Sequence, residues 1–399
     1  MLITLLVFLI ILSVLVIIHE LGHFLVAKKF GIKVEEFGFG LPPRVFGFKK
    51  GETLYSVNWL PIGGFVKLYG EDEAGGGKVQ LKVQSSKSKV KELNRAFFAR
   101  PVGQRAAVVV AGVVMNAILA IIIFYGFLFI SNFKTQLPLL GEHKFFGVEQ
   151  SNTSDIVINA VAKDSPAEKT GIKPLSKIVS IDGKKITDQK DLIAIINENK
   201  GKEIEVVWQD VNTNKIYKGS VVPRVSPPKG EGSLGISFFP VTMVVLDYKT
   251  PAQKVFSGIV HPVNLMVYNF DVMGQLIGVS IKEKNAAPLG EGVSGPVGIY
   301  SLVGNIVQIP NLKERVLQVL NLAGILSISL AFFNILPIPA LDGGRLFFIV
   351  FEGVTRRKIP ARFESWAHAI GMIVLLSLIA LVTVHDLMRV FSGKGLFTP

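Results

Sequence analysis

The sequence predicts a polytopic α-helical membrane protein with about four transmembrane helices, β-hairpins that re-enter the membrane region, and an inserted α+β domain. Hydrophobic residues make up 49% of the 399-residue chain and the mean hydropathy is +0.47, which exceeds what a soluble protein of this length needs. Long apolar runs lie on both sides of a polar stretch at 145–239. Basic residues flank several of these runs, as membrane topology requires.

Two features of the composition exclude other classes of protein and site. The net charge of +13 comes from 43 basic and 30 acidic residues. Much of the excess borders apolar runs and no nucleic-acid-binding motif lies beside it, so we expect the lipid bilayer, and no nucleic acid, as a partner. The chain has no cysteine, so a bound zinc ion must be held by His, Asp or Glu.

The first predicted span, at 1–27, contains a candidate zinc site. His19 and His23 are one helical turn apart, so both imidazoles can face one point in space. Glu20 lies beside the pair and is the candidate general base, while Gly22 would let another backbone come close. The alternatives are a chance match and a buried structural polar cluster, but ionisable groups inside a span are costly and usually functional.

The charges around this span predict its orientation. No basic residue precedes the apolar run, whereas Lys28, Lys29 and Lys33 follow it. The run is therefore expected to be a retained span rather than a signal peptide. The positive-inside rule places the N-terminus outside and the histidine end towards the cytoplasm.

Within the region 28–100, which is expected to be cytoplasmic or re-entrant, residues 34–70 have the composition of strands and turns. Aromatic and β-branched residues alternate with Gly and Pro, which predicts short hairpins that dip towards the site and offer a free strand edge. A solvated cytoplasmic loop is the alternative. Residues 71–91 have the composition of a flexible linker, and 92–100 predict a short interfacial helix.

The second predicted span, at 101–131, contains Asn116, and a single Asn in a span usually bonds to another helix. The third membrane region, at 313–354, is interrupted by two prolines and two glycines around Asp342, so its helix must break there. Asp342 is the best remaining carboxylate to complete a zinc site with the two histidines. A last span is predicted at 363–389.

The polar stretch 145–239 predicts strands and short helices in the order of a small α+β domain. Its Ser-Pro-Ala-x-x-x-Gly at 165–171, followed by an Ile-Asp-Gly turn at 181–183, resembles a PDZ domain. The resemblance implies a module that binds an extended peptide by strand addition. It follows an outgoing span and is expected outside. Residues 250–285 predict one or two amphipathic helices on the outer membrane surface, or helices that pack on the soluble domain.

Three motifs together resemble the site-2 protease family. They are His19-Glu20-Leu-Gly-His23, Gly63-Gly64-Phe65-Val-Lys67, and Asn334-x-x-Pro337-x-Pro339-x-Leu341-Asp342-Gly343-Gly344. The likeness covers nearly the whole chain, and the PDZ-like insert makes it similar to the bacterial regulator-of-sigma-E branch.

This resemblance implies roles for individual residues. It implies that His19, His23 and Asp342 bind Zn²⁺ and that Glu20 activates water. Asn116 and Asn334 would hold the substrate or the oxyanion. The region 54–68, with Gly63, Gly64 and Phe65, would form a re-entrant β-loop that pairs with substrate. The chain departs from the family in having Val113 where a Pro is frequent, and in having one PDZ-like stretch where some relatives have two.

The function expected from this resemblance is intramembrane zinc metalloproteolysis. The enzyme would hydrolyse peptide bonds within or near the spans of single-pass membrane proteins, such as anti-sigma factors or signal-peptide remnants, in the bacterial inner membrane. The PDZ-like domain would bind a peptide or a substrate already cut outside, and it would lie on the periplasmic side with both termini. Three alternatives are a receptor whose zinc is structural, a transporter built on the broken span, and an anchored soluble metalloprotease.

Overall fold

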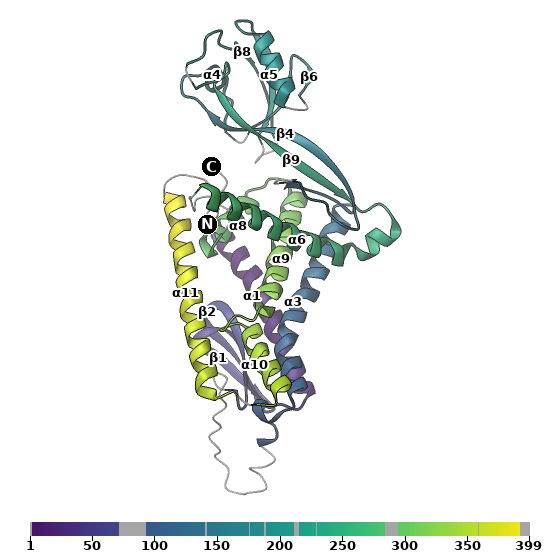
Figure 1. The fold of residues 1–399 in the computed structure, drawn as a ribbon, viewed down its shortest axis with the longest axis vertical. Coiled ribbons are helices and arrows are strands. Elements are labelled where there is room, and N and C mark those ends of the chain that lie inside the picture. The colour runs from purple at the N-terminus through teal and green to yellow at the C-terminus, as the bar shows by residue number, and fades with distance from the viewer. Residues whose placement is uncertain are drawn as a thin grey trace.

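The computed structural model describes residues 2–71, 93–139, 142–174, 176–186, 189–210, 215–228, 230–283, 294–357 and 359–391. It consists of a helical bundle, a long hairpin set against the bundle, and a sheet domain that stands beyond one end of it (Figure 1). The predicted linker at 71–91 lies almost wholly outside the described residues.

Within the described parts of the chain, four helices of the bundle are long and apolar enough to cross a membrane, which confirms the predicted number. They are α1 (Leu2–Lys29), α3 (Val102–Ile130), α9 (Leu312–Ile335) and α11 (Ala361–Phe391). Helix α3 packs against both α1 and α9, whereas α11 runs along one side of the bundle (Figure 1).

The third membrane region is broken where the sequence predicted. Helix α9 ends at Ile335, and α10 (Asp342–Thr355) begins six residues later. Pro337 and Pro339 lack the N–H that a continuing helix would use. Ala340 has a φ of +79°, a left-handed conformation that turns the chain just before Asp342.

Short paired stretches fill this region, in line with the predicted short hairpins, and their re-entry into the membrane stays a prediction. They belong to β1 (Val34–Lys50) and β2 (Thr53–Leu68), which together we call the hairpin. Residues 46–50 pair with 53–57, whereas residues 36–39 pair with 54–57 on one side and with 64–67 on the other. The hairpin packs against α1.

The described residues after the linker, 93–100, differ from the short interfacial helix predicted at 92–100. They contain one turn of 3-10 helix, η1 (Phe97–Ala99). Backbone bonds hold it to the hairpin, because Phe97 N–H donates to Tyr69 O at 2.8 Å and Lys33 N–H donates to Arg95 O at 3.1 Å. The turn is thus part of the hairpin's base.

The sheet domain is antiparallel, with strand order β3-β9-β4-β5-β7-β8 and with β6 paired to β5. Its strands are β3 (Lys134–Leu139), β4 (Glu149–Val161), β5 (Ser176–Ile181), β6 (Lys184–Lys185), β7 (Ile204–Asp210), β8 (Ile216–Val221) and β9 (Ile236–Asp247). Two helices cover it, α4 (Pro166–Thr170) and α5 (Gln189–Glu198). Each predicted element of 145–239 has a counterpart here.

Strand β9 extends beyond the predicted domain to Asp247, and together with β4 it connects the domain to the bundle. Strands β4 and β9 pair from Val161 and Ile236 down to Glu149 and Asp247, and β3 pairs with the lower half of β9. Among the described residues, the pairing of β3 with β9 ends at Leu139 and Thr242, two residues after Pro240.

A single helix, α6 (Pro251–Glu283), occupies the region predicted to hold one or two amphipathic helices. It lies across the end of the bundle, next to the sheet domain (Figure 1). A short helix, α8 (Pro296–Val307), follows and contacts α1 and α11. The N–H groups of Gly295 and Gly298 at its start donate to the buried Asp386 of α11 at 3.0 and 2.8 Å.

A buried polar cluster joins α6 to β9 and α3. The Tyr248 hydroxyl lies 3.1 Å from Nδ1 of His261, whose ring stacks on Phe127. Asn264 donates to the carbonyl of Phe146 at 2.9 Å and accepts from its N–H at 3.1 Å. Burial lowers the pKa of His261 to about 4, so its ring is neutral at pH 7.

Candidate metal centre

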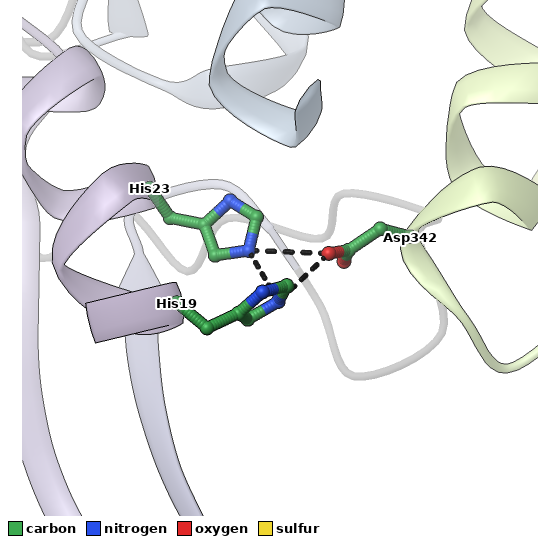
Figure 2. Close-up of side chains that lie close together, drawn as sticks. All are labelled: His19, His23 and Asp342. Carbon is green, nitrogen blue, oxygen red and sulfur yellow. Dashed lines mark hydrogen bonds and ion pairs between the residues drawn. The ribbon is translucent and has the colours of Figure 1, made fainter. Parts of the chain in front are cut away.

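Two histidines on α1 and one aspartate on α10 converge on a single point. His19 and His23 are one turn apart, and their Nε2 atoms lie 3.2 Å from each other. Oδ2 of Asp342 lies 3.0 Å from the Nε2 of His19 and 3.3 Å from that of His23. Figure 2 shows the three side chains pointing at one another from the two helices. Among the described residues, these three form the group that could hold a metal ion.

The break between α9 and α10 places Asp342 at this point. Asp342 is the first residue of α10, and Gly343 and Gly344 follow it. A Cβ on Gly343 would collide with the Leu336 carbonyl oxygen, and a Cβ on Gly344 would lie 2.5 Å from the Ile338 carbonyl oxygen. The two glycines therefore let α10 start directly against the broken segment.

The geometry fits a tetrahedral zinc ion. Such an ion, about 2.0 Å from each of three ligand atoms, places those atoms about 3.3 Å apart, close to the 3.0 to 3.3 Å observed here. Oδ2 of Asp342 is buried and has no hydrogen-bond partner. A buried carboxylate oxygen without a donor is costly, and a cation would satisfy it.

Helix α3 contacts the back of both imidazoles. Nδ1 of His23 lies 2.8 Å from the Val108 carbonyl oxygen, which can only accept, so Nδ1 donates. The Asn116 amide lies 3.2 Å from Nδ1 of His19, and Asn116 is 0% exposed. The structure thus places Asn116 behind a histidine rather than in an open position.

Gly112 on α3 is a site residue whose contact with the histidines our sequence reasoning did not predict. A Cβ at this position would lie 2.5 Å from Nε2 of His23 and 2.7 Å from Cε1 of His19. Its spacing of one turn from Asn116 was the available signal. On α1, a Cβ on Gly22 would collide with the Ala111 carbonyl, which confirms that Gly22 lets another backbone approach.

The hairpin lies beside Glu20. A Cβ on Gly64 of β2 would be 3.3 Å from Cγ of Glu20 and 3.1 Å from the Gly38 carbonyl oxygen. Gly63 has a φ of +87°, and the Phe65 ring covers Gly38. Strand backbone rather than a bulky side chain therefore faces the candidate base.

Asn334 lies in the last turn of α9, eight positions before Asp342, and is half-buried. The structure therefore places it on the α9 side of the break, with Asp342 on the α10 side.

Two further contacts hold the broken segment in place, and no sequence pattern predicted either of them. Arg345, one turn after Asp342, donates to Glu71 beyond the end of β2 at 2.6 Å. Nδ1 of His368 on α11 accepts the Ala340 N–H at 3.0 Å. The position of Asp342 thus depends on the hairpin and on α11 as well as on its own helix.

Comparison with known proteins identifies the family. The model of peptidase family M50 matches residues 7–378. The chain belongs to peptidase family M50. A Clostridium perfringens chain, provisionally named a zinc metalloprotease, is 32% identical to this M50 peptidase over 375 residues, which cover 94% of this chain and 96% of the relative.

Two further relatives carry the name RasP. The regulator of sigma-W protease RasP of Bacillus subtilis is 28% identical to this M50 peptidase over 455 residues, covering 97% of this chain and 99% of the relative. The zinc metalloprotease RasP of Shouchella clausii is 28% identical over 456 residues, covering 98% and 100%. Family membership confirms the predicted peptidase class, and the relatives' names confirm zinc as the metal of these enzymes.

Family membership also decides between the alternatives. A receptor and a transporter do not fit a peptidase family, and an anchored soluble metalloprotease would have its motif in the sheet domain rather than on α1, a candidate span. A PDZ domain of an SdrC-like protein from Listeria monocytogenes matches 25% of this M50 peptidase and 93% of that chain, at 19% identity and a TM-score of 0.18. That score is too low to support a conclusion, so the PDZ assignment remains a prediction.

Proposed function

We propose that this M50 peptidase is an intramembrane zinc metalloprotease that cuts peptide bonds within or near the spans of single-pass membrane proteins. The observation that carries the proposal is the convergence of His19, His23 and Asp342. Two of these residues lie on a candidate span, and the third lies just beyond the end of another. Peptide hydrolysis at such a site would take place at the depth of the membrane helices.

His19, His23 and Asp342 are the proposed zinc ligands. A zinc ion held there would act as a Lewis acid and make water acidic enough to lose a proton near neutral pH. Glu20, next to His19 in the sequence, is the proposed acceptor of that proton and its donor to the leaving amine. Asn334 is proposed to donate to the substrate carbonyl as negative charge develops on its oxygen.

The hairpin is proposed to hold the substrate as an added strand. A substrate helix keeps its carbonyl groups in its own hydrogen bonds, so the bond to be cut must first unwind. In the described part of the hairpin, residues 64–67 of β2 pair on one side with residues 36–39, and their other edge can accept an extended chain. Gly63, Gly64 and Phe65 lie on β2 near Glu20, where such a chain would pass the base.

The remaining partners follow from the relatives and the topology. The name of the Bacillus relative, regulator of sigma-W protease, supports a single-pass regulator such as an anti-sigma factor as substrate. Signal-peptide remnants are the other class considered. The PDZ-like domain is proposed to bind a peptide or an upstream-cleaved substrate on the periplasmic side of a bacterial inner membrane, with both termini. The metal centre would then face the cytoplasm, following Lys28 and Lys29 at the end of α1.

The decisive experiment uses Glu20→Gln in the full-length protein. Zinc content, measured by atomic absorption, should equal that of wild type because the ligands are unchanged. Cleavage of a reconstituted single-pass substrate should fall to background because the proton acceptor is lost. Retained cleavage would remove Glu20 as the base. Membrane fragments that accumulate in cells carrying Glu20→Gln, and not in wild type, would identify the substrates.

A further inference from the structure

Asn116 has a bonding pattern that substrate binding does not explain. It is fully buried in α3, and the amide atom placed as Nδ2 lies 3.2 Å from Nδ1 of His19. Its Oδ1 has no hydrogen-bond partner. The nitrogen and oxygen of an amide occupy almost the same space, so either atom can face the ring. Either orientation leaves one amide atom unpaired, and the protonation of His19 must decide between them.

The proposed zinc ligation determines where the proton on His19 lies. Nε2 of His19 faces His23 and Asp342, so that atom must offer its lone pair to a metal. A neutral imidazole then carries its proton on Nδ1, and this N–H needs an acceptor. His23 has such an acceptor in the Val108 carbonyl at 2.8 Å. For His19 the group in that place is the Asn116 amide.

The position of Asn116 is itself fixed by neighbouring contacts. Its backbone carbonyl accepts a hydrogen bond from the Ser327 hydroxyl of α9 at 2.8 Å, and Ser327 is fully buried. One turn earlier on α3, Gly112 brings the backbone up against both imidazole rings. Asn116 thus lies at the junction of the helix that carries the histidines and the helix that leads to Asp342.

We propose that Asn116 is a positioning residue for His19 and does not bind substrate. With the oxygen and nitrogen of the amide exchanged, Oδ1 faces the ring and accepts the His19 Nδ1–H. This bond fixes the tautomer and aims Nε2 at the zinc ion. The inference rests on the proposed function, because it assumes zinc at His19, and it replaces the substrate-binding role predicted for Asn116. Partners of metal-bound histidines act in this way in many zinc sites.

The test compares Asn116→Leu with Asn116→Asp in the full-length protein in detergent. Zinc affinity is measured by competition between the metal-free protein and a chelating dye. Asn116→Leu should weaken zinc binding by about 10- to 100-fold, because the acceptor is lost. Asn116→Asp keeps an acceptor of the same shape and should bind zinc at least as tightly as wild type. The visible spectrum of the Co²⁺ form should change in Asn116→Leu and not in Asn116→Asp.

Controls separate this role from a general loss of structure. Thermal unfolding of the metal-free forms checks that each variant folds. Asn116→Ala removes the acceptor without adding bulk and should reproduce the loss if the leucine variant does not fold. Asn334→Leu should keep the wild-type zinc affinity, because Asn334 is proposed to contact substrate.

Two results would overturn the role of Asn116. One is wild-type zinc affinity in Asn116→Leu and Asn116→Ala, and the other is an equal loss in Asn116→Asp. A wild-type protein that binds no zinc would instead overturn the proposed function, so the two failures can be distinguished.

Discussion

The molecule contains two buried histidine clusters that use their polar atoms in opposite ways. Between α6 and β9, His261 pairs with Tyr248, and Asn264 pairs with both backbone groups of Phe146. At the metal centre, by contrast, Oδ2 of Asp342 is buried with no hydrogen-bond partner while two imidazole nitrogens point at it. The first cluster satisfies its own groups, whereas the second leaves its groups facing a common point.

This difference separates a cluster that stabilises the fold from one that binds a ligand. Buried polar groups that satisfy one another contribute to stability and specify how helices meet. Groups that converge without satisfying one another cost stability unless a ligand completes them. Substitutions at the metal centre should therefore remove zinc and activity without lowering stability, and substitutions near His261 should do the reverse.

The largest expected effect is that of Asp342→Asn. An amide oxygen is a weaker zinc ligand than a carboxylate, so zinc content and peptidase activity should both fall to background. The metal-free variant should unfold at a temperature no lower than metal-free wild type, because a buried charge has been removed. Zinc analysis and thermal unfolding of the same samples check both statements. A variant that unfolds early yet keeps its zinc would contradict the comparison.

Next in size is Gly112→Ala, which adds one methyl group against both imidazoles. We expect zinc binding to weaken by at least about tenfold, comparable to loss of a histidine's outer partner. Gly126→Ala on the same helix is a matched control, because a Cβ there meets nothing within 4 Å. Chelator competition should show a defect in the first variant alone. Equal zinc affinities in the two variants would contradict the prediction and would mean that α3 can move away from α1 at little cost in free energy.

The cluster around His261 should instead affect how the free energy of unfolding depends on pH. Burial lowers the pKa of His261 to about 4 from an ordinary value of 6.5, so the unfolded chain binds a proton in this range before the folded one does. The free energy of unfolding should therefore decrease by up to about 3 kcal/mol as the pH falls from 6.5 to 4. His261→Phe should flatten this part of the curve and leave zinc content unchanged. Denaturant titrations at several pH values would measure it, and an unchanged slope in the variant would rule out His261 as its source.

The smallest expected effect is at a partly exposed cluster of charged residues, which serves as a reference for the two buried clusters. Glu52, in the turn of the hairpin, contacts Arg95 at 2.7 Å and Lys28 at 2.8 Å. These bonds lower the pKa of Glu52 to about 2, and the bond from Arg95 contributes most. The stabilisation is present above pH 4.5 and is lost as the pH falls towards 2. Because these side chains are partly exposed, Glu52→Gln should cost under about 1 kcal/mol at pH 7. Thermal unfolding checks this, and a much larger loss would show that the hairpin depends on this contact.

Features of the fold that depend on composition along the chain were predictable. Hydropathy alone predicts α1, α3, α9 and α11, because a span must satisfy its backbone internally over about 20 apolar residues. The break before Asp342 was predictable because Pro337 and Pro339 cannot continue a helix. With no cysteine in the chain, a carboxylate or another histidine had to complete the pair, and Asp342 is the carboxylate at the break of a predicted span.

Features that depend on contacts between distant segments were not predictable. The place of Asn116 behind His19 and the contact of Gly112 with both rings depend on how α3 is rotated against α1, which no local pattern records. The first half of β4 is polar and has weak β propensity, so its strand is defined by pairing with β9. The pairing of residues 36–39 with two different parts of β2 likewise depends on contacts that the local sequence does not show.

The β4–β9 ribbon has a mechanical consequence. Its paired strands run without a break from the far domain to Tyr248 and α6, with one irregularity near Ile158. Thirteen residues of strand span roughly 40 Å, and hydrogen-bonded ribbons resist bending far better than a single extended chain. A change in the orientation of the sheet domain would therefore be transmitted through the ribbon to α6. The paired strands thus form a stiff connection that couples the orientation of the sheet domain to that of the helices.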